Sequence, residues 1–416
     1  MAQVQVKYDA IIVGGGPAGS TAAINLTGCG GRVLLLDRAR FPRIKPCGGG
    51  ISYRLYRRFP YLDDAFKTVP TNFVHKVVFQ SPSGATVESE SVEPLYAMVR
   101  RFDFDAALLE KCRQCGIEIR EGISIARCEV RCDGVNLVSS SGEVFSAELV
   151  IGADGVNSVI AVHGGFRGSW EPSSVAIDGT EESPLKKSSP HQDTMFIFYG
   201  VHGGFGYGYV FPKAGHINFG IGYRLDYYRE HVASNAYEKH GTFLRELQTS
   251  RIVEGASQRQ NFHAYLVPLG GPLARISSNR ILLAGDAAGF VNGFTAEGIY
   301  YAMVSGEHAG RTAMKALRQR NFSRQFLAQH DAACQAEVGS ELRESVAIQR
   351  RMVCSPKRID SIVRLAARSA SMRNLLTSFA VGKISYRELK KRAATESLPA
   401  YLWYKATKLG YSLSQQ

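Results

Sequence analysis

Short apolar runs flank a small-residue segment near the start of the chain. Tyr8–Val13 and Arg32–Leu36 are apolar runs of strand length, and Ser20–Leu26 between them has the small and apolar residues of a closely packed helix. An apolar run without alternation is typical of a strand buried on both faces, as in a parallel sheet. The pattern therefore predicts a strand–helix–strand unit and an α/β fold.

Polar and apolar positions alternate farther along the chain. Met195–Val201, Gly206–Phe211 and Ile217–Tyr223 alternate as strands of an antiparallel sheet do, and Lys213–His216 supplies a turn between the last two. The polar, proline-containing segment Glu181–Gln192 predicts a loop. From residue 331 onward the pattern is helical. We therefore expect a β-rich domain inside the α/β domain, followed by a helical region.

Glycines stand between the first predicted strand and helix. Gly14 permits a tight turn, Gly16 lets the backbone approach a pyrophosphate, and Gly19 lets the helix and strand pack closely. The helix N-terminus adds N–H groups and a positive dipole. Asp37 ends the second strand, where a carboxylate accepts hydrogen bonds from ribose hydroxyls. Together these features indicate a dinucleotide site and leave NAD and FAD open.

Several later segments resemble blocks of known flavoproteins. Arg101–Asp105, which opens a helix through Cys112, Gly152–Ser158 and Leu282–Gly289 resemble the flavoprotein hydroxylase superfamily, although Ile160 stands near the place of its usual arginine. Lys45–Gly50, Asn292–Ala302 and Tyr207–Lys213 resemble the geranylgeranyl reductase branch, with Gly204 and Tyr209 in place of the branch's proline and tryptophan. The resemblance covers about residues 8–315 and implies FAD.

The resemblance also implies a domain organisation and a set of cofactor residues. A Rossmann-type FAD-binding domain is expected over 1–75, 100–160 and 270–330, an antiparallel-sheet substrate domain over 76–99 and 161–269, and a helical basic region over 331–416. The residues implied in FAD binding are Gly14, Gly16, Ala18, Gly19, Asp37, Cys47, Gly48, Gly50, Arg101, Ala126, Asp154, Gly285, Asp286, Gly298 and Ile299.

The implied activity is FAD-dependent reduction of isoprenoid carbon–carbon double bonds of the geranylgeranyl type. An isolated alkene has no carbonyl to accept electron density, so hydride transfer needs a proton at the neighbouring carbon. Tyr207, Tyr209 and Cys47 are the candidate catalytic residues. Aromatic faces would stabilise developing positive charge, and a tyrosine hydroxyl or bound water would supply the proton. For most aromatic residues of the predicted sheet, plain core packing is the stronger expectation.

Other chemistry on the same fold stays open. An FAD-dependent monooxygenase or halogenase acting on an aromatic metabolite is the alternative enzyme, although the Trp-x-Trp-x-Ile-Pro sequence of the halogenase branch does not occur in the chain. A flavin-bearing electron-transfer or membrane-associated binding protein is the non-enzymatic alternative. The electron source for the reductase is NADPH or a reduced electron-transfer protein, and the residues do not distinguish the two.

The positive charge gathers at the end of the chain. The 416 residues carry a formal net charge of +13, and from Arg350 to Gln416 fourteen basic residues face three acidic ones. The apolar positions Ile362, Val363, Leu365 and Ala366 and the cluster Tyr401–Lys405 accompany this charge. The combination favours an anionic membrane surface or a prenyl diphosphate as partner, with a solvated helical face as the alternative. No recognition motif accompanies the charge, so nucleic acid is not expected.

Cysteine usage and the first residues indicate a compartment. Eight cysteines in 416 residues are too sparse for a disulfide scaffold, and Met1–Lys7 lacks the apolar stretch of a secretory signal. We expect a cytoplasmic protein that is peripheral on the inner face of the membrane if it binds lipid. The pairs Cys112/Cys115 and Cys128/Cys132 have no nearby histidine, so packing is favoured over a metal site.

Overall fold

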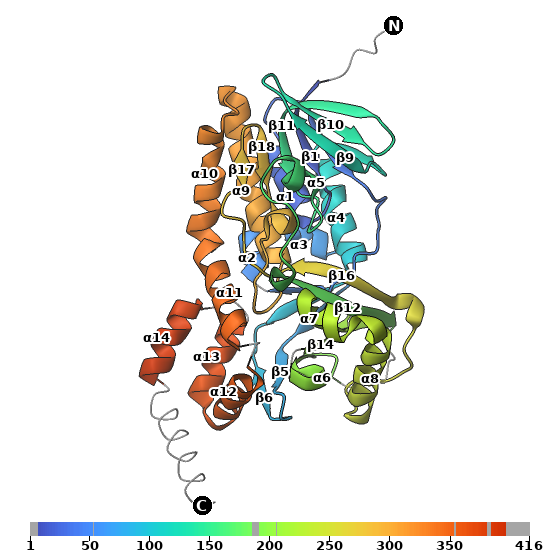
Figure 1. Ribbon diagram of the computed structural model, residues 1–416, viewed down its shortest axis with the longest axis vertical. Helices are drawn as coiled ribbons and strands as arrows, with labels where there is room; N and C mark the ends of the chain where they lie inside the picture. Colours follow the sequence, from blue (N-terminus) through green and yellow to red (C-terminus); the bar gives the residue numbers. More distant parts are fainter. Residues whose placement is uncertain are drawn as a thin grey trace, which may run out of the picture.

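The computed structural model describes residues 7–52, 54–184, 191–204, 206–352, 355–380 and 384–396. Two large sheets form the two halves of an elongated molecule, with long helices along one side (Figure 1). One half holds the first two strands of the chain together with strands from 118–152 and 277–283, and the other holds strands from 76–90 and 175–268. The expected α/β fold class with a β-rich second part is confirmed.

The first large sheet is mainly parallel. Its order is β17–β18–β11–β1–β2–β8, and β9 and β10 form a hairpin on β11. β1 pairs in parallel with both β11 and β2. The strands are β1 (Lys7–Val13), β2 (Val33–Asp37), β8 (Glu118–Glu121), β9 (Ile125–Val130), β10 (Val135–Ser139), β11 (Val144–Gly152), β17 (Ser277–Ser278) and β18 (Ile281–Leu283).

Burial of both faces explains the apolar runs in this sheet. Successive residues of a strand point to opposite faces. Ile11 and Leu34 accordingly join one buried cluster, whereas Ile12 and Leu35 join another on the opposite face. The second cluster is covered by α1 (Pro17–Leu26), α4 (Arg101–Gln114) and α9 (Ile299–Gln319). The predicted helix from Arg101 and the first strand–helix–strand unit are confirmed.

The second large sheet is antiparallel except for one pair. Its order is β16–β12–β15–β14–β13–β5–β6, and β13 runs parallel to β5. A small third sheet has the order β3–β7–β4. The strands are β3 (Gly50–Ser52), β4 (Thr71–Val74), β5 (Lys76–Gln80), β6 (Thr86–Glu90), β7 (Tyr96–Val99), β12 (Val175–Pro184), β13 (Thr194–Gly200), β14 (Gly206–Lys213), β15 (His216–Arg224) and β16 (Phe262–Pro268).

Two details of this region differ from the sequence-based expectation. The loop expected from Glu181 is wrong at its start, because β12 continues to Pro184 in register with β15. Glu181 is fully buried and accepts hydrogen bonds from Ser257 and Ser183, which explains how a polar segment remains a strand. In addition, β7 lies within the segment expected to join the substrate domain but pairs with β3 and β4.

Helices complete both halves. Those of the first 260 residues besides α1 and α4 are α2 (Arg54–Arg58), α3 (Leu62–Phe66), α5 (Val159–His163), α6 (Val201–Gly204), α7 (Leu225–His231), α8 (Ala236–Thr249) and the short turns η1 (Pro172–Ser174), η2 (Ala233–Asn235) and η3 (Arg259–Asn261). The later ones besides α9 are η4 (Gly285–Ala288), α10 (Arg324–Cys334), η5 (Gln335–Gly339), α11 (Ser340–Met352), α12 (Pro356–Arg368), α13 (Ala370–Ala380) and α14 (Tyr386–Glu396).

The C-terminal helices pack on the second sheet instead of presenting an apolar face. Val363, Leu365 and Ala366 of α12 are buried with Val87 and Met195 of the sheet. The protein itself therefore covers Val363, Leu365 and Ala366, whereas Ile362, the fourth apolar position expected to favour a membrane or a prenyl diphosphate, is half-buried. The cluster Tyr401–Lys405 lies outside the described residues. Among the described residues, no helix is long and apolar enough to cross a membrane.

Candidate active site

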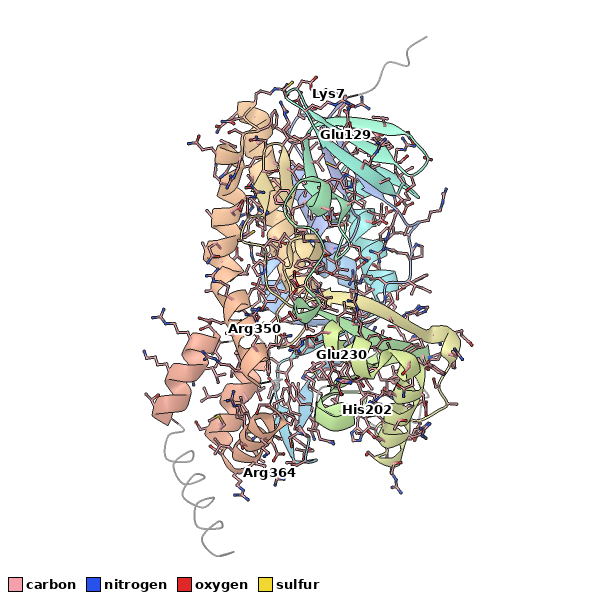
Figure 2. All side chains as sticks on the ribbon, viewed as in Figure 1. Lys7, Glu129, His202, Glu230, Arg350 and Arg364 are labelled. Carbon is pink, nitrogen blue, oxygen red and sulfur yellow. The ribbon has the colours of Figure 1, made fainter. Side chains whose placement is uncertain are left out.

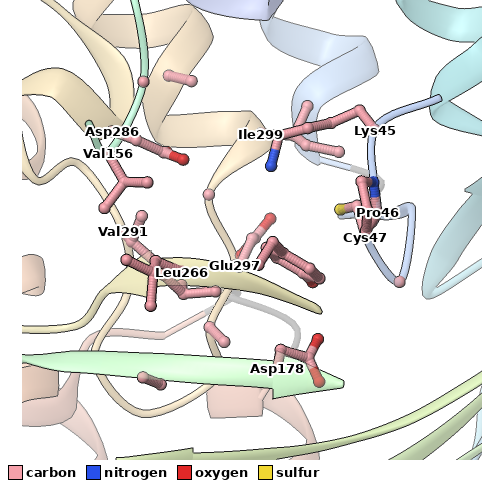
Figure 3. Close-up of a pocket in the computed structure, with 18 of the residues that line it drawn as sticks. Lys45, Pro46, Cys47, Val156, Asp178, Leu266, Asp286, Val291, Glu297 and Ile299 are labelled. Carbon is pink, nitrogen blue, oxygen red and sulfur yellow. The ribbon is translucent and has the colours of Figure 1, made fainter. Parts of the chain in front are cut away.

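One large cavity lies between the two large sheets. Its volume is about 1110 Å³, and its wall includes residues from the glycine turn, the 43–50 segment, β12, β14 and the start of α9. Figure 3 shows Lys45, Cys47, Asp178, Asp286 and Glu297 around this space. Pockets that bind one drug-sized ligand measure roughly 300–1,000 Å³. The cavity therefore has room for a dinucleotide and part of a second molecule.

The glycine turn forms one end of the cavity. Gly14 has φ +105°, and a Cβ on it would lie 2.2 Å from the Ala153 carbonyl oxygen. A Cβ on Gly19 would lie 1.8 Å from the Gly14 carbonyl oxygen, so glycine is required where α1 packs on the turn. A Cβ on Gly16 would meet no protein atom closer than Arg43 Nη2 at 3.7 Å. The lack of a side chain at Gly16 therefore keeps cavity space open, and protein packing does not require it.

A carboxylate holds the same turn in place. Asp37, at the end of β2, accepts a hydrogen bond from Gly15 N at 2.7 Å and another from Ala39 N at 2.7 Å. The residue lines the cavity and is buried. No side chain caps the first N–H groups of α1, which begins at Pro17. These N–H groups and Asp37 are the donors and the acceptor that a pyrophosphate and a ribose need.

Two arginines share one buried carboxylate beside the turn. Arg101 donates to both oxygens of Asp105, at 2.6 and 2.7 Å, and Arg43 Nη2 lies 2.9 Å from Asp105 Oδ2. Burial alone would lower the pKa of Arg101, but Asp105 raises it above its ordinary value. Both arginines line the cavity. One positive charge of the trio remains uncompensated, which favours an anionic ligand.

The 45–50 loop brings backbone close to the second sheet. Gly49 has φ +69°, and a Cβ there would lie 2.0 Å from the Val99 carbonyl oxygen. Gly49 N donates to Cys47 Sγ at 3.4 Å, and buried Lys213 donates to the Cys47 carbonyl at 3.3 Å. Lys45 Nζ lies 4.6 Å from the centre of the Tyr265 ring. Burial lowers the pKa of Lys45. The loop is thus fixed against the sheet with Cys47 half-buried at the cavity wall.

The start of α9 closes the other side of the cavity. Gly285 has φ +62° and donates from its N–H to Ser305 Oγ at 2.9 Å, which places Asp286 at the wall. No side chain caps α9, whose first residue is Ile299 after Gly298. Burial raises the pKa of Glu297, and Arg54 at 3.4 Å acts in the opposite direction. The exposed amides of this helix start favour negative charge in the cavity.

Aromatic and aliphatic side chains line the part of the cavity next to the second sheet. The rings of Tyr207 and Tyr209 lie 6.4 Å apart, and Phe211 lies 4.8 Å from Tyr209. Tyr199 and Phe294 stack with their centres 5.8 Å apart. The other apolar or aromatic members of this wall are Val77, Phe79, Tyr96, Met195 and Ile197. This part suits a hydrocarbon chain or an aromatic ring.

One carboxyl group interrupts the apolar wall. Asp178 of β12 is only 6% exposed, and its Oδ2 accepts a hydrogen bond from Tyr209 at 2.8 Å. Burial raises the pKa of Asp178 to about 6, while Tyr265, Tyr209 and Lys45 act in the opposite direction. The group therefore changes protonation near neutral pH.

Nearly all of the candidate site residues predicted from the sequence line the same cavity. Gly14, Gly16, Ala18, Asp37, Cys47, Gly48, Gly50, Arg101, Asp154, Tyr207, Tyr209, Gly285, Asp286, Gly298 and Ile299 all line the cavity. Asp154 also caps α5 by accepting from Val159 N at 2.7 Å. Gly19 lies behind the wall as a packing residue. Ala126 is exposed and is not part of the lining, which includes its neighbours Ser124 and Ile125 instead.

Sequence reasoning did not find Asp178, Arg43, Lys45 or Tyr265 as site residues. Asp178 carried one usable signal, since it is a lone acid in an otherwise apolar and small-residue strand start, Val175–Gly179. The described residues contain no group of three His, Cys, Asp or Glu side chains that could hold a metal ion. Cys112 is buried and donates to the Ser20 carbonyl at 3.4 Å.

The residues present fit FAD. The open face of Gly16, the uncapped N-termini of α1 and α9, Asp37 and the Arg43–Arg101 pair supply contacts for a pyrophosphate, a ribose and an electron-rich ring along one continuous cavity. The FAD binding domain family matches residues 7–334. The chain therefore belongs to this family of FAD-binding flavoproteins.

Comparison with individual similar proteins narrows the group of FAD-binding proteins to which this chain belongs. Geranylgeranyl diphosphate reductase of Rhodobacter capsulatus is 32% identical over 323 residues, covering 75% of this chain and 76% of that protein. Protein FixC of Escherichia coli is 28% identical over 351 residues, covering 78% and 80%. A geranylgeranyl bacteriochlorophyll reductase-like structure from Thermoplasma acidophilum superposes with a TM-score of 0.79 at 19% identity, covering 94% and 99%. The protein is an FAD-dependent oxidoreductase of the geranylgeranyl reductase-like group.

Proposed function

We propose that this protein reduces carbon–carbon double bonds of geranylgeranyl-type isoprenoid chains. The observation that supports this proposal most is that the cavity is continuous. The glycine turn with Gly16 and Asp37 and the apolar wall with Tyr207 and Tyr209 line the same space. A prenyl chain is long, apolar and carries isolated alkenes. An apolar wall that shares one cavity with the cofactor would bring such an alkene to the flavin.

Bound FAD in its reduced form supplies hydride. The chain's own residues have three tasks. Arg43, Arg101 and the helix starts hold the anionic cofactor. The faces of Tyr207 and Tyr209 stabilise the positive charge that develops on the carbon next to the protonated alkene carbon. The packed wall excludes water, which would otherwise trap that charge as an alcohol.

The three candidate catalytic residues take different parts in this proposal. Tyr207 and Tyr209 contact the substrate, and Cys47 lies in the loop that contacts the flavin ring. Burial raises the pKa of the Tyr207 hydroxyl well above its ordinary value, so this phenol holds its proton firmly. The group best suited to proton delivery must therefore be sought elsewhere in the wall. NADPH or a reduced electron-transfer protein would restore the reduced flavin.

The polar end of the substrate would lie beside the C-terminal helices. Arg350 of α11 is exposed, yet it also lines the cavity together with Gln349 and Thr377. Figure 2 shows Arg350 between the two halves of the molecule and Arg364 at the far end of the second half. A diphosphate at Arg350 would let the chain extend inward to the aromatic wall. The basic helices beyond it would favour an anionic membrane nearby.

The test is anaerobic incubation of chemically reduced, FAD-loaded protein with geranylgeranyl diphosphate and with geranylgeraniol. Mass spectrometry of the products should show gains of hydrogen pairs, with more product from the diphosphate. Oxygen consumption coupled to hydroxylation or halogenation of an aromatic compound, with no prenyl reduction, would overturn the proposal. Flavin redox cycling without any organic product would also overturn it and would favour an electron-transfer role.

A further inference from the structure

Two carboxyl groups of the cavity lining, Asp178 and Glu297, have a buried oxygen with no hydrogen-bond partner among the described residues, and Asp178 is the one that belongs to the second sheet. Its Oδ2 is held by the Tyr209 hydroxyl at 2.8 Å, whereas its Oδ1 is buried and has no hydrogen-bond partner among the described residues. A buried, unpartnered carboxyl oxygen normally costs free energy. Proteins retain such groups mainly where they act on a ligand.

The neighbouring strand leaves space next to this oxygen. Asp178 is paired across the sheet with Gly222 of β15, and a Cβ on Gly222 would lie 3.9 Å from Oδ1. Because residue 222 is glycine, no side chain of β15 covers the oxygen. Both Asp178 and Gly222 line the cavity. Asp178 thus forms part of the cavity wall at a point where β15 places no side chain, and Oδ1 itself is covered from solvent.

The groups that face Asp178 come from three other elements. β14 contributes Tyr209 and Tyr207, β16 contributes Tyr265, and the 45–50 loop contributes Lys45. The charge of Lys45 favours the ionised carboxylate, while burial favours the neutral acid and outweighs it. The result is a carboxyl group with a pKa of about 6, far more acidic than the phenols around it.

We propose that Asp178 is the general acid for alkene reduction and that Tyr209 is its positioning residue. The O–H bond of neutral Asp178 breaks, and its proton forms a C–H bond with the π electrons of one alkene carbon. The adjacent carbon, now electron-poor, would take up the hydride that FAD supplies when it is bound in its reduced form, so that FAD would be the two-electron reductant. The Asp178 carboxylate then takes a proton from water. The alkene gains two hydrogens, and the inference rests on the proposed function.

A binding experiment tests the carboxyl group apart from turnover. The probe is a prenyl analogue with a permanently charged quaternary ammonium nitrogen in place of the alkene carbon, bound to the FAD-loaded protein, and a neutral saturated analogue is its control. If only ionised Asp178 attracts the cation, affinity should be about 10-fold higher at pH 8 than at pH 5, since a pKa of about 6 leaves roughly one tenth ionised at pH 5. Asp178→Asn should abolish this ratio. A ratio unchanged in Asp178→Asn would overturn the inference.

Measuring prenyl reduction in variants tests the role of Asp178 separately from the proposed function. Asp178→Asn should lower prenyl reduction at least ~100-fold with flavin content intact, and Asp178→Glu should restore part of it. Tyr209→Phe should shift the pH profile of turnover, because it removes a donor to Asp178. Glu181→Gln is the matched control, since this buried acid of the same strand does not line the cavity.

The outcomes are distinct. Failure of the wild-type protein to reduce any prenyl alkene overturns the proposed function. Wild-type turnover in an Asp178→Asn protein that keeps its FAD overturns only the role of Asp178. An infrared titration that shows no carboxylic acid band disappearing with a midpoint near pH 6, or shows the same band in Asp178→Asn, also counts against that role.

Discussion

Replacing Gly16 with valine should remove FAD while the protein stays folded. Gly16 has φ −74° and ψ −175°, which any residue adopts, and its Cβ would lie 3.7 Å from the nearest atom beyond its chain neighbours. Losing glycine at the start of α1 costs about 1 kcal/mol of unfolding free energy. The valine methyl groups would instead occupy the space that a pyrophosphate needs. Loss of two charge-assisted hydrogen bonds, at roughly 1.5–3 kcal/mol each, weakens FAD binding about 10²–10⁴-fold.

The assay compares flavin content after purification, FAD affinity by fluorescence quenching and thermal unfolding of the apoprotein. Gly168→Val is the matched control, because Gly168 is exposed and has no atom within 4 Å of its Cβ position. It should keep full flavin content. Gly14→Val should fail differently, by misfolding, since its Cβ would lie 2.2 Å from a backbone oxygen. A folded Gly16→Val protein with wild-type flavin content would refute the assignment of the glycine turn.

Two further results are expected. Tyr207→Phe should keep FAD and most prenyl reduction, because the ring face that stabilises positive charge remains and the hydroxyl holds its proton firmly; a loss of turnover beyond 10-fold at unchanged flavin content would instead assign proton delivery to Tyr207. Sedimentation with anionic vesicles should exceed that with neutral ones and fall with added salt, and replacing exposed Arg387 and Lys391 of α14 with glutamine should reduce it; equal sedimentation with both vesicle types would contradict a membrane role for the basic helices.

The cofactor half of the cavity was predictable because local sequence encodes it. Gly14 takes a positive φ at the turn, Gly19 allows α1 to pack on that turn, and Gly16 keeps space for a ligand, all within one strand–helix unit of the sequence. Asp37 ends a strand whose parallel partner begins the same unit, so chain order alone brings it to Gly15. Arg101 needed the family resemblance, because its carboxylate partner Asp105 lies one turn along the same helix but its distance from the glycine turn depends on how α4 packs.

The substrate half was harder to predict because its contacts join distant segments. Alternation identified β14 and β15, but it did not show that Asp178 of β12 lies beside Tyr209, a contact set by strand order in the sheet. The C-terminal region shows the same limit. Its basic and apolar pattern fits a helix that faces lipid as well as it fits a helix packed on β6. Only the fold shows that Val363 and Ala366 are buried.

The division of the cavity between two sheets makes cofactor binding and proton delivery separable. Gly16 and Asp37 belong to the parallel sheet, which holds the cofactor, whereas Asp178 and Tyr209 belong to the antiparallel sheet and reach the same cavity from the other side. A variant at Asp178 leaves every contact of the glycine turn in place, and a variant at Gly16 leaves the Tyr209–Asp178 hydrogen bond in place. A change at Asp178 should therefore alter alkene protonation without altering FAD affinity, which is the physical reason why one cofactor domain can serve many substrates.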